Sequence, residues 1–283
     1  MPRLFCFGLG YSAAVLVRRL RSLGWDVAGT ARSADKVAAL RADGIPAWKF
    51  DGDTAMADAV TALAGATHVL VSAAPGAAGD PVLQHHGEDL RRLPHLEWVG
   101  YLSTTGVYGD HGGAWVDETS LLKPLSARSR ARAAAETAWL ASGLAVQVFR
   151  LAGIYGPGRS VIDDLRAGKG RRIDRPGHMF SRIHVEDIAT VLQASMQWPN
   201  PGAIYNVCDD EPAESAAVTA YAAELIGIAP PPLVPLEEAN MSPMALSFWA
   251  DHKRVRNDRI KSELGVRFDY PTYREGLQAI IGR

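Results

Sequence analysis

Cysteine is scarce in this sequence: the chain has two cysteines among 283 residues, and no C-x-x-C pair. Cys6 and Cys208 both lie in or next to apolar runs, which is typical of small buried side chains rather than of metal ligands. Long apolar runs are also missing, because no segment reaches the roughly 18 apolar residues that a membrane helix needs. The chain begins with a strand pattern rather than a signal peptide. We therefore expect no metal site, no membrane contact and a reducing, cytoplasmic compartment.

Charge of one sign is not in excess either, since the formal net charge is −1. This balance gives no general attraction to nucleic acid or to anionic membranes, so neither is an expected partner. Hydrophobic residues make up 47% of the chain, which is enough for a substantial core. The length allows one large domain, or one domain with a smaller lobe.

The most informative stretch is the beginning of the chain. A short apolar run, Leu4 to Phe7, breaks into Gly8 and Gly10 and then changes to a helix-forming segment, with Ala13 at the third small position of a G-x-G-x-x-[G/A] motif. In that motif the glycines let the backbone turn and approach a pyrophosphate, which faces a helix N-terminus. The alternative is an ordinary turn between a strand and a helix. The residues predicted here to bind a dinucleotide are Gly8, Gly10, Tyr11, Ser12 and Ala13.

Strands and helices alternate through the first half of the chain. Apolar runs at 25–30, 45–50, 68–71, 97–103, 144–150 and 204–208 are separated by helical segments near 35–40, 56–63, 80–93, 125–142 and 183–196. This alternation predicts an α/β fold: a Rossmann-type, doubly wound parallel sheet whose ligand lies beyond the carboxyl ends of the strands.

Arg32 follows the second predicted strand, where an acidic residue would hold the ribose hydroxyls of NAD. An arginine at this position favours the 2′-phosphate of NADP, so NADP is the expected cofactor and NAD the alternative. A solvated loop cation is the other interpretation of Arg32. Asp51 follows the third strand, where it could contact the adenine side or cap the next helix. Ser72, Ala73 and Ala74 follow the fourth strand and complete the predicted cofactor site.

The second half of the chain departs from the regular alternation. Residues 108–118 form a loop too long for a simple connection, and a basic, glycine-rich stretch follows residue 157. We expect a dinucleotide-binding domain at 1–157 and about 182–208, and a smaller, discontinuous C-terminal substrate-binding lobe at 158–181 and 209–283.

Four motifs occur in order: the Gly8 turn, Ser103-Thr104-Thr105-Gly106-Val107-Tyr108-Gly109, residues 150–159 with the sequence RLAGIYGPGR, and residues 183–189 with the sequence IHVEDIA. Together they resemble the NAD-dependent epimerase/dehydratase family, the extended short-chain dehydrogenase/reductase class. The resemblance spans nearly the whole chain. It implies a Rossmann fold and an enzyme that acts on a small polar substrate, anionic or similar to a nucleotide sugar.

The resemblance also implies catalytic roles. Family members use a Ser or Thr after the fifth strand, matched by Thr104, and a Tyr-x-x-x-Lys pair on the next helix. This chain has Arg128-x-x-x-Arg132 in place of that pair. Arginine stays protonated at neutral pH, so Arg128 cannot exchange a proton as a tyrosine would. Arg132 can still replace the lysine as a cationic contact to the nicotinamide ribose.

Three possibilities remain open at this stage. Another residue supplies the acid or base, with Tyr108, His111 and Tyr155 nearest by motif position. Alternatively, Arg128, Arg159 and Arg182 bind the phosphate or carboxylate of an anionic substrate. The third possibility is a non-catalytic NADP-binding sensor or scaffold protein. The catalytic candidates are Thr104, Tyr108, Arg128 and Arg132, and the candidates for substrate binding are His111, Tyr155, Arg159 and Arg182. A homodimer is possible, as in relatives.

Overall fold

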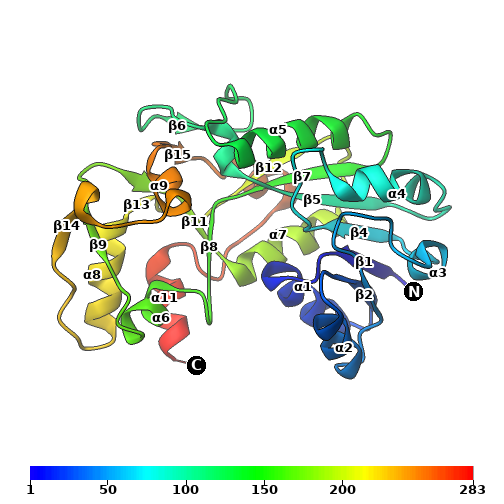
Figure 1. The fold of residues 1–283 in the computed structure, drawn as a ribbon, viewed down its shortest axis with the longest axis horizontal. Coiled ribbons are helices and arrows are strands. Elements are labelled where there is room, and N and C mark those ends of the chain that lie inside the picture. The colour runs from blue at the N-terminus through cyan, green and yellow to red at the C-terminus, as the bar shows by residue number, and fades with distance from the viewer. Residues whose placement is uncertain (283) are drawn as a thin grey trace. The chain divides into compact units, whose positions relative to one another are not determined.

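A seven-stranded sheet forms the centre of the fold in the computed structural model, which describes residues 1–282 (Figure 1). Its strand order is β12-β7-β5-β4-β1-β2-β3, and β1 pairs in parallel with both β2 and β4. The order reverses between β1 and β4, the position where doubly wound sheets bind ligands. This confirms the predicted fold class. The strands are β1 (Arg3–Phe7), β2 (Asp26–Ala31), β3 (Ala47–Lys49), β4 (His68–Val71), β5 (Trp98–Thr104), β7 (Val146–Leu151) and β12 (Ile204–Val207).

Helices connect these strands, and local sequence explains where several of them begin. Ser33 caps the helix α2 by accepting a hydrogen bond from the Lys36 N–H, and Asp80 caps α4 just before Pro81. The helices are α1 (Tyr11–Ser22), α2 (Ala34–Ala42), α3 (Ala59–Leu63), α4 (Pro81–Arg91), α5 (Ala127–Leu140) and α7 (Val185–Gln197).

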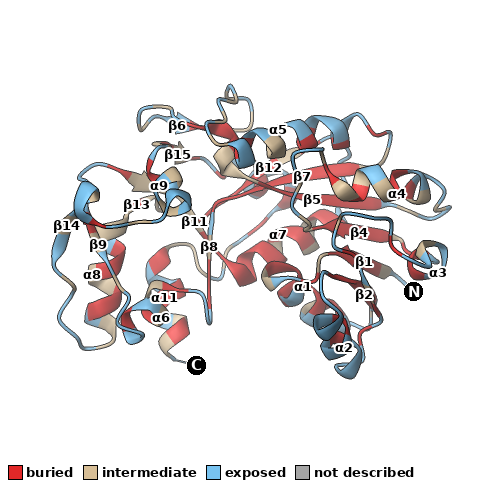
Figure 2. Cartoon of the chain, viewed as in Figure 1, coloured by how far each residue is buried: buried red, intermediate tan, exposed pale blue. Residues whose placement is uncertain are grey.

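The core of the sheet is continuous and apolar (Figure 2). Every residue of β4 is buried, as are all residues of β1 except Arg3. Such uninterrupted burial follows from helices covering both faces of the sheet. Large aromatic side chains fill this core, among them Phe5, Phe7, Tyr101 and Trp139.

The chain divides into two compact units. The first unit holds residues 1–104, 127–150 and 188–205, and the second holds 105–126, 151–187 and 206–283. The segment 105–126 therefore groups with the later part of the chain, whereas the sequence analysis placed it with the sheet. The functions predicted for the two parts stay predictions.

The second unit is built from short elements. Its strands pair two by two: β6 with β15, β8 with β11, β9 with β14 and β10 with β13. An apolar cluster that includes Ile162, Ala222 and Leu277 packs α6, α8 and α11 together. The elements are η1 (Thr105–Tyr108), β6 (Trp115–Val116), β8 (Gly153–Tyr155), α6 (Val161–Arg166), β9 (Arg172–Asp174), β10 (Met179–Phe180), β11 (Arg182–His184), β13 (Ala213–Glu214), α8 (Ser215–Leu225), β14 (Leu233–Pro235), η2 (Leu236–Glu238), α9 (Pro243–Trp249), β15 (Arg254–Val255), α10 (Asp258–Leu264) and α11 (Tyr273–Ile281).

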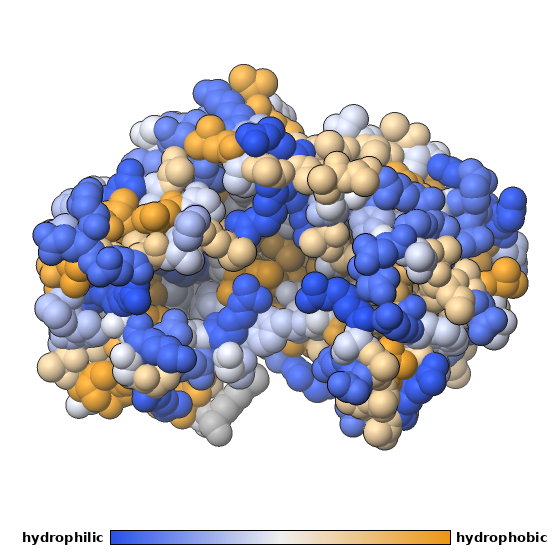
Figure 3. All heavy atoms as spheres, in the orientation of Figure 1, coloured by the Kyte–Doolittle hydropathy of each residue, from blue (hydrophilic) through white to orange (hydrophobic). Residues whose placement is uncertain are grey.

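Three predicted elements differ from the observed ones. The third strand is shorter than predicted and covers only Ala47–Lys49, while the helix predicted from residue 56 begins at Ala59. Ile183 and His184, predicted as helix, form part of β11 because they pair with β8, and α7 begins at Val185. No helix within residues 1–282 is long and apolar enough to cross a membrane. The face shown in Figure 3 is mainly hydrophilic, with scattered apolar side chains.

Candidate functional site

The turn between β1 and α1 has the geometry that the glycine motif predicts. Gly8 has a φ of +94°, and its N–H donates to Thr30 Oγ1 over 2.9 Å. A Cβ atom at Gly8 would lie 3.2 Å from the backbone nitrogen of Ala73. Glycine is thus required twice, for its backbone conformation and for the close approach of the loop after β4.

Helix α1 begins directly behind this turn. Gly10 is its N-cap residue and supplies no side chain to the first N–H groups of the helix. A Cβ atom at Gly10 would meet no atom within 4 Å, so the space in front of the helix end is open. Uncapped N–H groups and the helix dipole make such an end suitable for a phosphate. Ser12 and Ala13 are buried on the side of α1 that packs on the sheet, and Tyr11 is half-buried. These residues fit a dinucleotide.

The other predicted cofactor residues follow neighbouring strands. Arg32 is exposed and comes immediately after β2. The N–H groups of Ser72 and Ala73 both donate to the Phe7 carbonyl, which holds the loop after β4, with Ala74 next along it, beside the glycine turn. Gly8, Arg32 and this loop therefore stand at the carboxyl ends of three adjacent strands, β1, β2 and β4.

Asp51 lies after β3, with its carboxylate 3.1 Å from Lys49 Nζ. Lys49, together with the N–H of Asp53, holds the pKa of the Asp51 carboxyl below its ordinary value. Asp51 does not cap the next helix, because Asp58 is the N-cap residue of α3. Of the two roles expected for Asp51, the contact to the adenine side stays a prediction.

A second group of candidates lies where β5 ends and α5 begins. We call residues 101–104 and 128–136 the β5–α5 corner. Arg132 Nη1 donates to the Leu102 carbonyl over 2.5 Å and lies 3.3 Å from the Tyr101 hydroxyl. Thr104, the last residue of β5, is half-buried, and Arg128 is exposed in the first turn of α5. Arg132 is therefore anchored to the strand that ends in Thr104.

Beneath this corner is a buried polar network that the sequence analysis did not foresee. Ser103 Oγ donates to Glu136 Oε1 over 2.5 Å, and Arg150 Nη2 donates to Glu136 Oε2 over 2.7 Å. All three residues are buried. The network joins α5 to the ends of β5 and β7. The one feature of the sequence that indicated this network is Arg150, a charged residue at the end of the apolar run of β7. A buried arginine needs a buried partner.

Apart from its arginines, the corner contains two titratable side chains, Tyr101 and Glu136, and the buried Asp80 of the α4 N-cap lies near enough to interact electrostatically with Tyr101 and Arg132. Tyr101 is fully buried, and burial raises the pKa of its phenol above the ordinary value despite the opposing effect of Arg132. Glu136 is held in the ion pair with Arg150. Burial also raises the pKa of the Asp80 carboxyl above its ordinary value.

Two predicted acid or base residues lie in the second unit and are held by protein contacts. Tyr108 is fully buried, and its hydroxyl donates to Asn206 Oδ1 over 2.7 Å. His111 is half-buried, with Nε2 3.1 Å from the Leu121 carbonyl. The structure thus gives Tyr108 a packing role, whereas His111 stays accessible.

The remaining candidates for substrate binding surround the β8–β11 pair. Burial raises the pKa of the Tyr155 phenol, whose hydroxyl donates to the Thr272 carbonyl over 3.4 Å. Arg182 Nη1 donates to the carbonyls of Phe180 and Ala213. Arg159 lies in the turn after β8 and is exposed. Tyr155 and Arg182 are thus brought to one strand pair.

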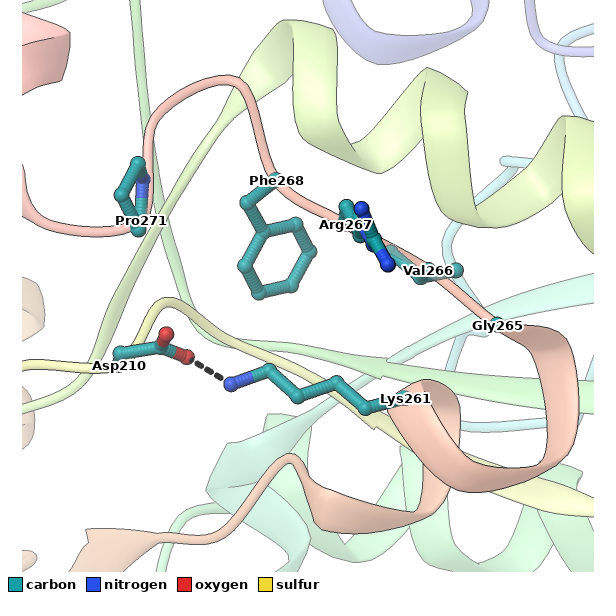
Figure 4. Close-up of a pocket in the computed structure, with 7 residues that line it drawn as sticks. All are labelled: Asp210, Lys261, Gly265, Val266, Arg267, Phe268 and Pro271. Atoms are coloured by element: carbon teal, nitrogen blue, oxygen red, sulfur yellow. Dashed lines mark hydrogen bonds and ion pairs between the residues drawn. The ribbon is translucent and has the colours of Figure 1, made fainter.

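A surface pocket in the second unit contains none of the predicted residues (Figure 4). Two cations, Lys261 and Arg267, line it, and Lys261 Nζ is paired with Asp210 Oδ1 over 2.5 Å. Within residues 1–282, no group of three His, Cys, Asp or Glu side chains is arranged to hold a metal. The residues that line the pocket are Asp210, Lys261, Gly265, Val266, Arg267, Phe268 and Pro271.

Three of the relatives found by comparison with known proteins are informative. A functionally unknown conserved protein from Silicibacter pomeroyi is 53% identical, with a TM-score of 0.92 over 100% of this chain and 99% of that one. Protein YeeZ of Escherichia coli K12 is 28% identical over 286 residues, 96% of this chain and 97% of YeeZ. A 3-diazoavenalumate denitrifying reductase from a Streptomyces species is 30% identical over 163 residues, 54% of this chain and 52% of the reductase. No family model matches the sequence.

Solved structures extend the comparison to fold. A UDP-glucuronic acid 4-epimerase variant from Bacillus cereus, in complex with NAD and a fluorinated substrate analogue, is 17% identical with a TM-score of 0.78, covering 100% of this chain and 98% of the epimerase. The dTDP-glucose 4,6-dehydratase from Bacillus anthracis, in complex with NAD, is 18% identical with a TM-score of 0.76, covering 100% of this chain and 96% of the dehydratase. The chain has the fold of the NAD-dependent epimerases and dehydratases. This confirms the fold that the four motifs implied, and its structural neighbours bind NAD.

Proposed function

We propose that this protein is an NADP(H)-dependent oxidoreductase that transfers hydride to or from a small, anionic substrate. The observation that carries the proposal is the open, uncapped start of α1 at Gly10, with Arg32 at the end of the neighbouring strand β2. The helix end suits the pyrophosphate, and the guanidinium suits the 2′-phosphate that distinguishes NADP from NAD. Gly8, Tyr11, Ser12, Ala13 and the loop 72–74 complete the proposed cofactor site.

Reduction is favoured over epimerisation or dehydration by the chemistry of the β5–α5 corner. Sugar epimerases and dehydratases must remove a proton from a hydroxyl group, and an arginine cannot accept one. Hydride transfer is the chemistry that the nicotinamide supplies, and the protein positions the substrate and stabilises the negative charge that develops on it. One relative is a reductase by name, and its named substrate carries a diazo group.

We assign roles on this basis. The Thr104 hydroxyl donates to the reacting group, Arg132 contacts the nicotinamide ribose, and Arg128 binds the anionic end of the substrate. Arg159 and Arg182 of the second unit are further candidates for that anion, and His111 is a candidate for polar contact. Residues 1–157 with about 182–208 would bind the dinucleotide, and the rest the substrate.

A non-catalytic NADP(H)-binding sensor or scaffold is the second candidate. The specific observation in its favour is that the corner's titratable side chains other than arginines, Tyr101 and Glu136, and the neighbouring Asp80 are all buried.

Fluorescence titration with NADPH and NADH tests the proposed cofactor. A single charge-assisted contact of about 1.5–3 kcal/mol predicts that NADPH binds about 10- to 150-fold more tightly than NADH. Equal affinities would contradict the NADP preference. Oxidation of NADPH by a panel of carbonyl, quinone and nucleotide-sugar compounds then separates an enzyme from a sensor. Turnover that survives in Thr104→Val would remove the proposed site.

A further inference from the structure

We propose that the stacked imidazole rings of His178 and His252 form a pH-sensitive contact that holds residues 110–114, which we call the loop tip, against the segment before β15. Protonation of this histidine pair would release the loop tip while the rest of the second unit stays folded. The loop tip carries His111, one of the candidates for substrate binding. The proposal concerns the second unit alone and does not depend on the proposed cofactor or substrate.

The backbone of His252 holds the loop tip. The N–H groups of His111 and Gly113 both donate to the His252 carbonyl, over 3.0 and 2.9 Å. In the other direction, the His252 N–H donates to Asp110 Oδ1 over 3.0 Å. Because three hydrogen bonds meet on one residue, the position of the loop tip is tied to that of His252.

The ring of His252 contacts both the loop tip and His178. A Cβ atom at Gly113 would lie 2.6 Å from His252 Cε1, so the ring packs directly on the Gly113 backbone. The ring centroids of His252 and His178 are 4.6 Å apart, and the two planes differ by 22°. Phe180 and Trp249 pack on His178 with centroid distances of 4.8 and 5.4 Å. The histidine pair is thus enclosed by aromatic side chains and by loop backbone.

Neither ring has a partner for an added proton in this position. The Nε2 atoms of both His178 and His252 are buried, and neither has a hydrogen-bond partner within residues 1–282. A neutral imidazole has one N–H group, whereas an imidazolium has two and needs an acceptor for each. Protonation would therefore bury a charged N–H group without an acceptor, which is costly. Exposure of the ring to water removes this cost, and it requires His252 to move away from the loop tip.

Two cations near the histidine pair oppose a further positive charge. Arg175 Nη1 donates to the Trp249 carbonyl over 2.6 Å, which places its guanidinium beside the rings. Lys253 is buried and follows His252 in the chain. Burial, and then the charge of Arg175, lowers the pKa of His178 to about 4. The direction of this shift agrees with the missing acceptors.

The carboxylates in this part of the unit are those of Asp110, Asp251 and Glu214. Asp110 interacts electrostatically with both histidines and favours their charged form. The N–H groups of Gly112 and His252 hold the pKa of the Asp110 carboxyl below its ordinary value, so Asp110 keeps its charge while the histidine pair titrates. Asp251 is paired with Lys253 over 3.4 Å, and Glu214 accepts a hydrogen bond from the Gly177 N–H. None of these carboxylates accepts a hydrogen bond from either Nε2 atom.

The two ends of the loop are held independently of the histidine pair. At one end, the Tyr108 hydroxyl donates to Asn206 Oδ1, and the Tyr108 carbonyl accepts a hydrogen bond from the Lys123 N–H over 3.1 Å. At the other end, β6 lies beside β15, and the Arg256 N–H donates to the Val116 carbonyl over 2.9 Å (Figure 1). Release should therefore be confined to the loop tip.

Hydrogen exchange, followed by NMR on 15N-labelled protein, measures this release. The readouts are the N–H groups of His111 and Gly113, and the controls are those of Arg256 in the β6–β15 pair and of Gly153, which donates to the Ser181 carbonyl. Between pH 7 and pH 4.5, we expect the protection factors of the two readouts to fall at least about 10-fold, after correction for the intrinsic pH dependence of exchange. Those of the controls should change less than about 2-fold.

Matched variants assign the effect to the histidine pair. The double variant His178→Phe/His252→Phe keeps two stacked rings and removes both titrating groups, so the loop tip should stay protected at pH 4.5. The exposed control His95→Phe should behave as the parent protein does. In the parent protein itself, NMR titration of the ring carbon Cε1 of His178 and His252 should give a midpoint that coincides with the loss of protection, a readout that needs no variant to fold.

Four outcomes would overturn the proposal. One is unchanged protection of His111 and Gly113 at pH 4.5. Another is an equal loss of protection at Arg256 and Gly153, which would indicate acid unfolding of the whole unit. The third is the parent's loss of protection in the double variant, which would place the titrating group elsewhere. The last is a ring titration whose midpoint differs from that of the release.

Discussion

In the β1–α1 turn and in the β5–α5 corner, a parallel strand leads into a loop that is followed by a helix. The two regions differ in how closely their residues match the motifs of the epimerase/dehydratase family. At the turn, Gly8 and Gly10 keep the motif, and Gly8 has a clear geometric reason in its positive φ and its closeness to Ala73. At the corner, the sequence predicts Arg128 and Arg132 at the positions where the family resemblance implies a tyrosine and a lysine.

The difference teaches which part of the motif depends on shape and which depends on chemistry. A glycine at φ +94° against a neighbouring backbone has no substitute, because any Cβ would be strained. A catalytic tyrosine has a substitute if the reaction no longer needs its proton. On the proposed function, the fold would be kept while the reaction differs from that of an epimerase or dehydratase.

The largest loss of stability should come from breaking the buried network of Ser103, Glu136 and Arg150 beneath the corner. Glu136→Ala leaves Arg150 buried and unpaired, and we expect a loss of about 3–5 kcal/mol in the free energy of unfolding, measured with urea. The matched control is Glu88→Ala in α4, which breaks the exposed pair with Arg91 and should cost less than about 1 kcal/mol. Equal losses in the two variants would show that the corner is held by packing alone.

Gly8→Ala tests the turn. The new Cβ would be forced to φ +94° and into contact with the backbone nitrogen of Ala73, so we expect about 1–3 kcal/mol of destabilisation and at least about 10-fold weaker NADPH binding. Gly24→Ala is the control, since Gly24 has a φ of +81° but a Cβ there meets no atom within 4 Å. It should lose some stability and keep its affinity for NADPH. Unchanged affinity in Gly8→Ala would argue against a cofactor at this turn.

Arg32→Ala tests whether the β1–α1 turn and its neighbouring strand prefer NADPH to NADH. Removing the guanidinium should weaken NADPH binding about 10- to 150-fold while NADH binding stays the same, so the two affinities converge in fluorescence titrations. Lys36→Ala removes one positive charge from the exposed face of the following helix and should affect neither cofactor. A similar loss in both variants would indicate general electrostatic attraction instead of a phosphate contact.

A smaller, pH-dependent change in stability should come from His178, which lies in the second unit and in neither of the two regions compared above. Burial, and then the charge of Arg175, lowers the pKa of His178 to about 4 from an ordinary value near 6.5. The unfolded chain therefore binds this proton first as the pH falls, and stability should decline between about pH 6.5 and pH 4. In His178→Phe the urea midpoint should fall less over this range, whereas the exposed control His95→Phe should follow the parent protein. If the urea midpoints of all three proteins fall in parallel with pH, His178 is excluded as the source of the pH dependence.

Sequence alone was sufficient for the sheet, because its signal is local. The apolar runs of β1, β4 and β5 predict strands that are buried on both faces, and two glycines with their spacing predict the turn. The corner was only partly predictable. Ser103 and Glu136 are 33 residues apart, and Glu136 and Arg150 are 14 apart, so their meeting depends on how α5 packs. The motif position of Tyr108 likewise gave no sign that its hydroxyl is buried against Asn206.

The buried network has a further consequence for how α5 is seated. The middle of this helix is rich in alanine, at positions 131, 133, 134 and 135, and small, similar side chains allow a helix to pack in more than one register. Glu136 meets both Ser103 and Arg150 in one register only, and a shift by one turn would leave two buried charges without partners. The network thereby selects a single alignment of helix against sheet, and with it a single placement of Arg128 and Arg132.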